Sequence, residues 1–209
     1  MIDGDTCFYE RKGGLNCPIK KGNVKWVLHR FACDIAVLEE LKLEEVGCQV
    51  VVSLWGQCCV QLLFLPSMGH SGGIIIIWDP DVLELVDLRI ASFSVCYKFK
   101  SLLGNFVWGL IGVDGPNDDN VRSALFEELV TFMSNWDIPW CLGGGFNVVR
   151  FPSQRSTGGR LNSAMIEFSD FIGSYNLIDP PLEGGCFTCS SHEEVPMLSR
   201  IDWFLLSSE

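Results

Sequence analysis

A long stretch without Asp, Glu, Lys or Arg, residues 46–78, most limits what this chain can fold into. A helix that crosses a membrane needs about 20 mostly apolar residues in succession. Here three glutamines, Pro66, His70 and five glycines interrupt the stretch, and its apolar runs are short and β-branched, as at 50–52 and 74–77. Such runs between turn residues are typical of buried strands. The sequence therefore predicts part of a sheet core here, and no membrane span.

Further apolar runs predict a protein with many strands. A buried run at 34–38 ends in Glu39 and Glu40. The other predicted strands are 50–55, 60–65, 74–78, 82–87, 91–99, 105–113, 139–143, 187–190 and 201–206. Many strands with few helices between them predict a two-layer or sandwiched α/β architecture.

Two segments have the periodicity of a helix. The first has apolar residues at helical spacing after a cap at Asp118, Asp119 and Asn120. Its predicted core face is Val121, Ala124, Leu125, Leu129, Phe132, Met133 and Trp136. The second helix is marked by Met165, Phe168, Ile172 and Tyr175.

Composition narrows the function and the compartment. The net charge is −11, which excludes a passive basic coat on nucleic acid but permits an enzyme that reaches phosphate through a metal. The first ten residues contain three acids and no apolar core segment, so no signal peptide is predicted. We expect a chain that is not secreted, in the nucleus or cytoplasm, with buried thiols among its ten cysteines. Cys186 and Cys189 have CxxC spacing, but two ligands are too few for zinc.

Three segments, in order along the chain, carry a family resemblance. Residues 38–43 (LEELKL) resemble a strand end written LQETKL, residues 143–149 (GGGFNVV) resemble GGDFNVV, and residues 199–207 (SRIDWFLLS) resemble SRIDYFLLS. Residues 113–117 (VDGPN) are similar to a VYGPN segment. This set resembles the endonuclease/exonuclease/phosphatase superfamily.

Longer segments resemble one branch of that superfamily, the endonuclease domain of plant LINE-type (non-LTR) retrotransposons. They are residues 64–73, 77–80, 150–156 and 177–182, and the likeness covers roughly 13–207. It implies one domain over 13–209 after a poorly assigned segment, 1–12.

The resemblance also implies a fold, the DNase I-like four-layer α/β sandwich of two mixed β-sheets flanked by helices. We expect its C-terminal strand or strands to be missing after Glu209, which would expose Phe204 and Leu205.

The resemblance assigns roles residue by residue. Glu40 stands at the metal-binding glutamate, Asn117 and Asn147 at phosphate-contacting asparagines, and Asp202 at the acid that orients a histidine. Gly145 stands where the family has the catalytic Asp. The asparagine of the first strand is Arg11, and the tyrosine before Gly115 is Asp114. The expected Ser-Asp-His segment is absent, and His29, His70 and His192 are predicted to be surface or loop residues.

These departures decide the expected activity. Phosphodiester hydrolysis of this kind uses Mg²⁺. Because Glu40 is the one metal-binding carboxylate retained at its usual place, Mg²⁺ should bind weakly. Losing several members of one catalytic unit leaves little rate. We expect a DNA endonuclease of retrotransposon origin that is defective, with Arg150, Arg155 and Arg160 in a loop that either contacts DNA phosphates or is simply solvated. A non-enzymatic fragment with weak or no nucleic-acid binding is the alternative, and a small-substrate phosphoesterase is a distant third.

Overall fold

The computed structural model describes residues 7–11, 18–41, 48–56, 59–65, 73–182, 185–191 and 196–208. Contacts divide the chain into two compact units, residues 1–86 with 99–107 and residues 87–98 with 108–209. The division passes through three strands, β5 (Leu83–Ile90), β6 (Ser94–Ser101) and β7 (Val107–Asp114).

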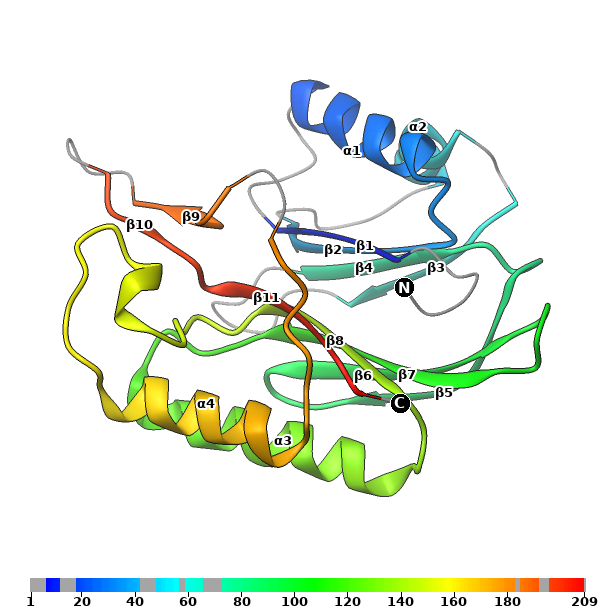
Figure 1. Ribbon diagram of the computed structural model, residues 1–209. Helices are drawn as coiled ribbons and strands as arrows, with labels where there is room; N and C mark the ends of the chain where they lie inside the picture. The colour runs from blue at the N-terminus through cyan, green and yellow to red at the C-terminus, as the bar shows by residue number, and fades with distance from the viewer. Residues whose placement is uncertain are drawn as a thin grey trace. The chain divides into compact units, whose positions relative to one another are not determined.

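The first unit contains a four-stranded sheet with the order β1-β2-β4-β3. β1 and β2 are parallel, and α1 makes the crossover that parallel neighbours require, while β4 runs antiparallel to both β2 and β3. Helices α1 and α2 lie along this sheet (Figure 1). The elements are β1 (Cys7–Arg11), α1 (Pro18–Arg30), β2 (Ile35–Leu41), α2 (Cys48–Trp55), β3 (Gln61–Leu65) and β4 (Gly73–Trp78).

The core of the first unit confirms most of the predicted strands. Residues 35–38 and 74–78 are buried, as their apolar runs predict. The predicted strand over 50–55 is wrong, because these residues belong to helix α2. Val51 and Leu54 face the core at helical spacing while Val52 is exposed. A short apolar run fits either element, and packing against α1 and β4 decides it.

The second sheet has five strands in the order β11-β8-β7-β6-β5. β7 and β8 are parallel and are joined through α3, whereas β11 is antiparallel to β8. Figure 1 shows α3 and α4 side by side along this sheet. The elements are β5 (Leu83–Ile90), β6 (Ser94–Ser101), β7 (Val107–Asp114), α3 (Arg122–Asn135), β8 (Trp140–Gly145), α4 (Ser163–Ser174), β9 (Cys189–Ser190), β10 (Leu198–Ser199) and β11 (Asp202–Leu206). Strands β9 and β10 pair with each other.

The helix predicted after Asp118 starts later than expected. Asp118 caps a short 3-10 turn, Asp119–Val121, by accepting from the Asn120 N–H, and α3 begins at Arg122. Val121 and Ala124 are therefore exposed, and Trp136 is half-buried. Leu125, Leu129, Phe132 and Met133 are buried, as their spacing predicts.

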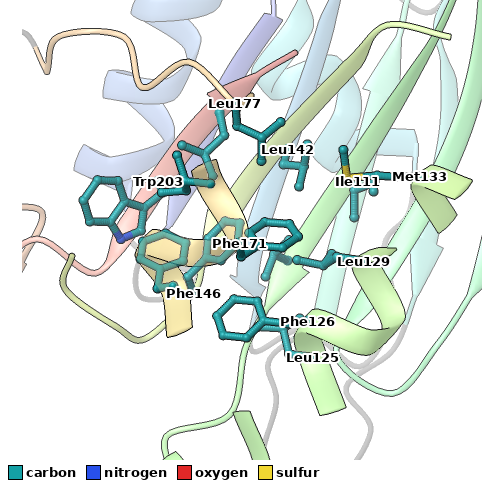
Figure 2. Close-up of a cluster of buried hydrophobic side chains, with 14 of the residues drawn as sticks. Ile111, Leu125, Phe126, Leu129, Met133, Leu142, Phe146, Phe171, Leu177 and Trp203 are labelled. Atoms are coloured by element: carbon teal, nitrogen blue, oxygen red, sulfur yellow. The ribbon is translucent and has the colours of Figure 1, made fainter. Parts of the chain in front are cut away.

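The core of the second unit is built around aromatic rings (Figure 2). The Phe168 ring lies 5.2 Å from Phe146 and 5.1 Å from Trp203, centroid to centroid, and Phe126 lies 5.2 Å from Phe171. Such pairs stabilise a core beyond the area they bury. These rings come from α3, α4, β11 and the loop after β8, so the core fixes that loop to the sheet.

The exposure predicted for β11 is wrong. Leu205 is fully buried and Phe204 is half-buried. The edge of β11 is covered by the segment after α4, where Ile178 and Leu206 exchange two backbone hydrogen bonds of 2.7 and 2.9 Å. Residues 7–11, which the sequence assigns to the N-terminal segment, form β1 and pair with β2. The domain boundary at residue 12 stays a prediction.

The glycine run of β8 permits close approach to β7. Gly144 has φ +148°, and a Cβ built on it would lie 2.0 Å from the carbonyl oxygen of Val113. That oxygen belongs to the backbone and cannot move aside without breaking the β7–β8 pairing. A side chain at position 144 is therefore incompatible with this sheet.

We predict that Gly144→Ala destabilises the protein by about 3 kcal/mol or more, since strain at positive φ adds to overpacking. Gly159→Ala is the matched control, because Gly159 has φ +131° with nothing within 4 Å of its Cβ position. It should cost about 1 kcal/mol. Urea unfolding midpoints compare the two variants. Equal losses would show that the contact with Val113 is unimportant.

Candidate functional site

Three strand ends bring predicted site residues together in the second unit. Gly145, the last residue of β8, pairs with Asp114 of β7 on one side and with Asp202 of β11 on the other. Residues paired in register point to the same face of a sheet. Two carboxylates therefore flank a position without a side chain, with their backbones about two strand spacings, roughly 9–10 Å, apart. Both are half-buried.

Gly145 is not required by the backbone. Unlike its neighbour Gly144, it is absent from the glycines with positive φ. It ends a regular strand, as predicted, and does not lie in a turn that needs left-handed geometry. The φ angle at 145 therefore does not call for glycine, whereas the backbone at 144 does.

Asn147 is held from three directions. Its backbone has φ +54°, a left-handed conformation that Asn tolerates better than most residues. Its side-chain Nδ2 donates to the Gly115 carbonyl at 2.5 Å, and its N–H donates to the Ile201 carbonyl at 3.2 Å. Its own carbonyl accepts from Arg122 Nη2 at 3.0 Å. This asparagine ties the loop after β8 to the loop after β7 and to the start of β11.

Arg122 is the residue of this site that the sequence reasoning missed. It is 1% exposed, unusual for an arginine, and starts α3. Its guanidinium donates to the carbonyls of Pro116 and Asn147, at 3.1 and 3.0 Å, and pairs with Asp119. It therefore links the two loops that carry Asn117 and Asn147. An arginine just after a predicted helix cap gives no sequence signal of a carbonyl partner 25 residues away.

The Ser-Arg-Ile-Asp segment is anchored by side chains on both sides. Arg200 makes a two-pronged ion pair with Asp179, with N–O distances of 2.5 and 3.2 Å, and its Cζ lies 4.1 Å from the Trp203 ring centroid. The Thr188 hydroxyl accepts from the N–H groups of Ile201 and Asp202, both at 3.1 Å. These contacts fix the backbone of Asp202 at the start of β11.

The arginine loop, residues 150–160, is ordered by its own polar groups. The Gln154 side-chain oxygen accepts from the N–H groups of Arg150 and Phe151, at 2.8 and 2.9 Å. Ser156 exchanges backbone and side-chain hydrogen bonds with Leu198 of β10. Arg155 and Arg160 are exposed, whereas Arg150 is half-buried with its Cζ 5.1 Å from the Phe151 ring centroid. The loop presents two arginines to solvent from a fixed backbone.

The remaining predicted residues are placed only in part. Asn117 is exposed in the loop after β7. Glu40 lies on β2 in the first unit, where the register against β4 shifts between Leu38 and Leu41, and its side chain is outside the described residues. His29 is exposed on α1, while His70 and His192 are outside the described residues. The metal-binding role of Glu40 stays a prediction.

Metal ligands are sparse in the part of the chain that the structure describes. No group of three or more His, Cys, Asp or Glu side chains there could hold a metal ion. Cys33, Cys96 and Cys141 are buried, and burial raises the pKa of the Cys96 thiol to about 12. Cys186 is exposed and Cys189 half-buried. Helices long and apolar enough to cross a membrane are absent from the described residues.

The fold matches solved structures at low sequence identity. An endonuclease/exonuclease/phosphatase from Bacteroides vulgatus aligns with a TM-score of 0.63 and 12% identity, over 97% of this chain and 85% of that one. D. rerio TDP2, solved with a single-strand DNA product, aligns at 0.67 and 12%, over 96% and 82%. The human Nocturnin catalytic domain, solved with bound sulfate, aligns at 0.61 and 14%, over 93% and 78%.

The chain has the endonuclease/exonuclease/phosphatase fold. This confirms the predicted DNase I-like α/β class, with its mixed sheets flanked by helices. At these identities the likeness establishes the fold alone. No family model matches the sequence, and no curated protein matches it.

We predict that Arg122→Met costs about 3 kcal/mol of stability, because it leaves Asp119 without its cation and two carbonyls without a donor. Arg160→Met, an exposed change of the same kind, should cost under about 0.5 kcal/mol. Urea unfolding of both variants makes the comparison. A small loss in Arg122→Met would mean that the two loops hold together without the guanidinium.

Proposed function

We propose that this chain is a defective DNA endonuclease related to plant LINE-type retrotransposon endonucleases, which keeps a DNA-contacting loop but hydrolyses little or no phosphodiester. One observation carries the proposal: Gly145 occupies the middle of three paired strand ends, between Asp114 and Asp202. The resemblance places the catalytic Asp at this position. A glycine there can neither accept a proton nor bind a metal.

The donor set of the second unit does not fit a tight Mg²⁺ site. Mg²⁺ prefers octahedral oxygen coordination and usually takes one or two carboxylates, with water and phosphate completing the shell. Asp114 and Asp202 are separated by the Gly145 gap, and the described residues offer no group of three ligands. We therefore expect Mg²⁺ to bind these residues weakly at best.

DNA is the partner that the remaining groups support. Arg155 and Arg160 are exposed on an ordered loop directly after the Asn147 segment, and Asn117 is exposed on the neighbouring loop. Arginines on a fixed backbone contact phosphates without reading sequence. Because the whole chain carries −11, binding should be weak and sensitive to salt. The alternative is a chain that does not bind nucleic acid, and the exposed arginines of this loop argue against it.

We predict that the purified protein leaves supercoiled plasmid intact in Mg²⁺ or Mn²⁺. Loss of the general base and its partners removes most of the rate. Gel analysis of plasmid after incubation provides the measurement, with Glu40→Ala as the control for a contaminating nuclease. Nicking by the wild type that disappears in Glu40→Ala would overturn the proposal.

A second prediction restores the missing carboxylate. Gly145→Asp should lower stability without metal, since three carboxylates then stand side by side on adjacent strands. Mg²⁺ at about 10 mM should recover that loss, because the new carboxylate closes the gap between Asp114 and Asp202. Activity should stay low, because Arg11 and Asp114 still stand where the resemblance has an asparagine and a tyrosine.

Gly145→Asn is the matched control, with the same size and no charge. Thermal unfolding of the three proteins with and without Mg²⁺ makes the test. A metal-dependent gain restricted to Gly145→Asp supports the proposal. The same response to Mg²⁺ in all three would remove the reason for placing a metal near residue 145.

A further inference from the structure

Helix α1 carries a cationic surface that the proposed function does not use. Lys20, Lys21, Lys25 and Arg30 fall within thirteen residues, and no acid occurs from 18 to 33. The chain as a whole is strongly acidic, so this cluster is not a reflection of its general charge. Within the part of the chain that the structure describes, Lys21, Lys25 and Arg30 form no ion pair with a carboxylate.

An exposed aromatic ring lies in the middle of this surface. Trp26 is 62% exposed and belongs to the solvent face of α1, one turn before Arg30 and next to Lys25. Phe31, directly after the helix, is 56% exposed, with the Arg30 Cζ 5.8 Å from its ring centroid. Large aromatic side chains are usually buried at least in part, so an indole held out among cations indicates a ligand with both charge and flat rings.

Helix α1 has a well-packed buried side, so missing packing does not explain why its aromatic and cationic side chains are exposed. Val24 and Leu28 are each 4% exposed and pack with Leu54 of α2 and Ile75 of β4. The apolar side of α1 is therefore already occupied. Its outer side offers one indole among polar residues and lacks the apolar stripe that an interfacial membrane helix needs.

We propose that the outer face of α1 binds single-stranded nucleic acid, with Trp26 stacking on an unpaired base and Lys25 and Arg30 contacting the flanking phosphates. A groove or face that combines cations with aromatic rings is how sequence-tolerant proteins hold single strands. Duplex bases are already stacked and would leave Trp26 without a partner. This surface is on the first unit, whereas Gly145 and the arginine loop are on the second.

The test measures fluorescence anisotropy of a labelled 20-nucleotide oligo(dT) and of an abasic strand of the same length, with the full-length protein. Trp26→Ala should weaken oligo(dT) binding about tenfold, because one stacked base is lost, and should leave the abasic strand unaffected. Lys25→Gln with Arg30→Gln should weaken both, and should lower the slope of log affinity against log salt by about 1.4.

Matched controls use the same unit. Leu103→Ala removes a side chain that is 85% exposed, and Lys100→Gln removes a cation on β6; neither should change oligo(dT) affinity by more than about twofold. The proposal is overturned if the wild type does not bind oligo(dT), or if Trp26→Ala binds both strands as the wild type does. Tighter binding to polyglutamate or to vesicles with anionic lipid than to oligo(dT) would also overturn it. The test measures binding and not plasmid nicking. Its result is therefore independent of whether the chain is a defective endonuclease.

Discussion

The pairing of β8 with β7 on one side and β11 on the other is the contact on which the second unit depends. It requires glycine at 144, where the Val113 carbonyl leaves no room for a side chain. Once formed, it sets Asp114, Gly145 and Asp202 in one row across three strands. This row determines which side-chain groups the edge of the sheet offers. They are two carboxylates, with no side chain between them.

The loops around this row are fixed by buried polar contacts. Arg122 bonds to Pro116 and Asn147, and Asn147 bonds to Gly115 and Ile201. Such contacts are costly to break, because each would leave a buried polar group or charge unsatisfied. The backbone of these loops is therefore held in place, although residue 145 has no side chain.

Part of the fold and of the candidate site could be predicted from the sequence, and each wrong or missing prediction has a physical reason. The apolar runs at 74–78 and 107–113 are strands, because β-branched and aromatic residues between turn signals leave few alternatives. Residues 48–55 form a helix in spite of their valines, because packing against α1 overrode local preference. Helix α1 has no clear apolar stripe, so periodicity could not find it. The order of the motifs along the chain singled out Asn147, Gly145 and Asp202, which the fold brings close together. The contact of Arg122 with Asn147 could not be predicted, because the two residues are 25 positions apart and no local pattern connects them.

We expect that the edge formed by Asp114, Gly145 and Asp202 does not hold a divalent metal tightly. Anomalous diffraction at the manganese edge, from wild-type crystals soaked in about 1 mM Mn²⁺, tests it most directly. No anomalous peak is expected between these strand ends. A full peak bound by the carboxylates of Asp114 and Asp202 would contradict it, and would show that the chain had rebuilt a metal site around the missing side chain.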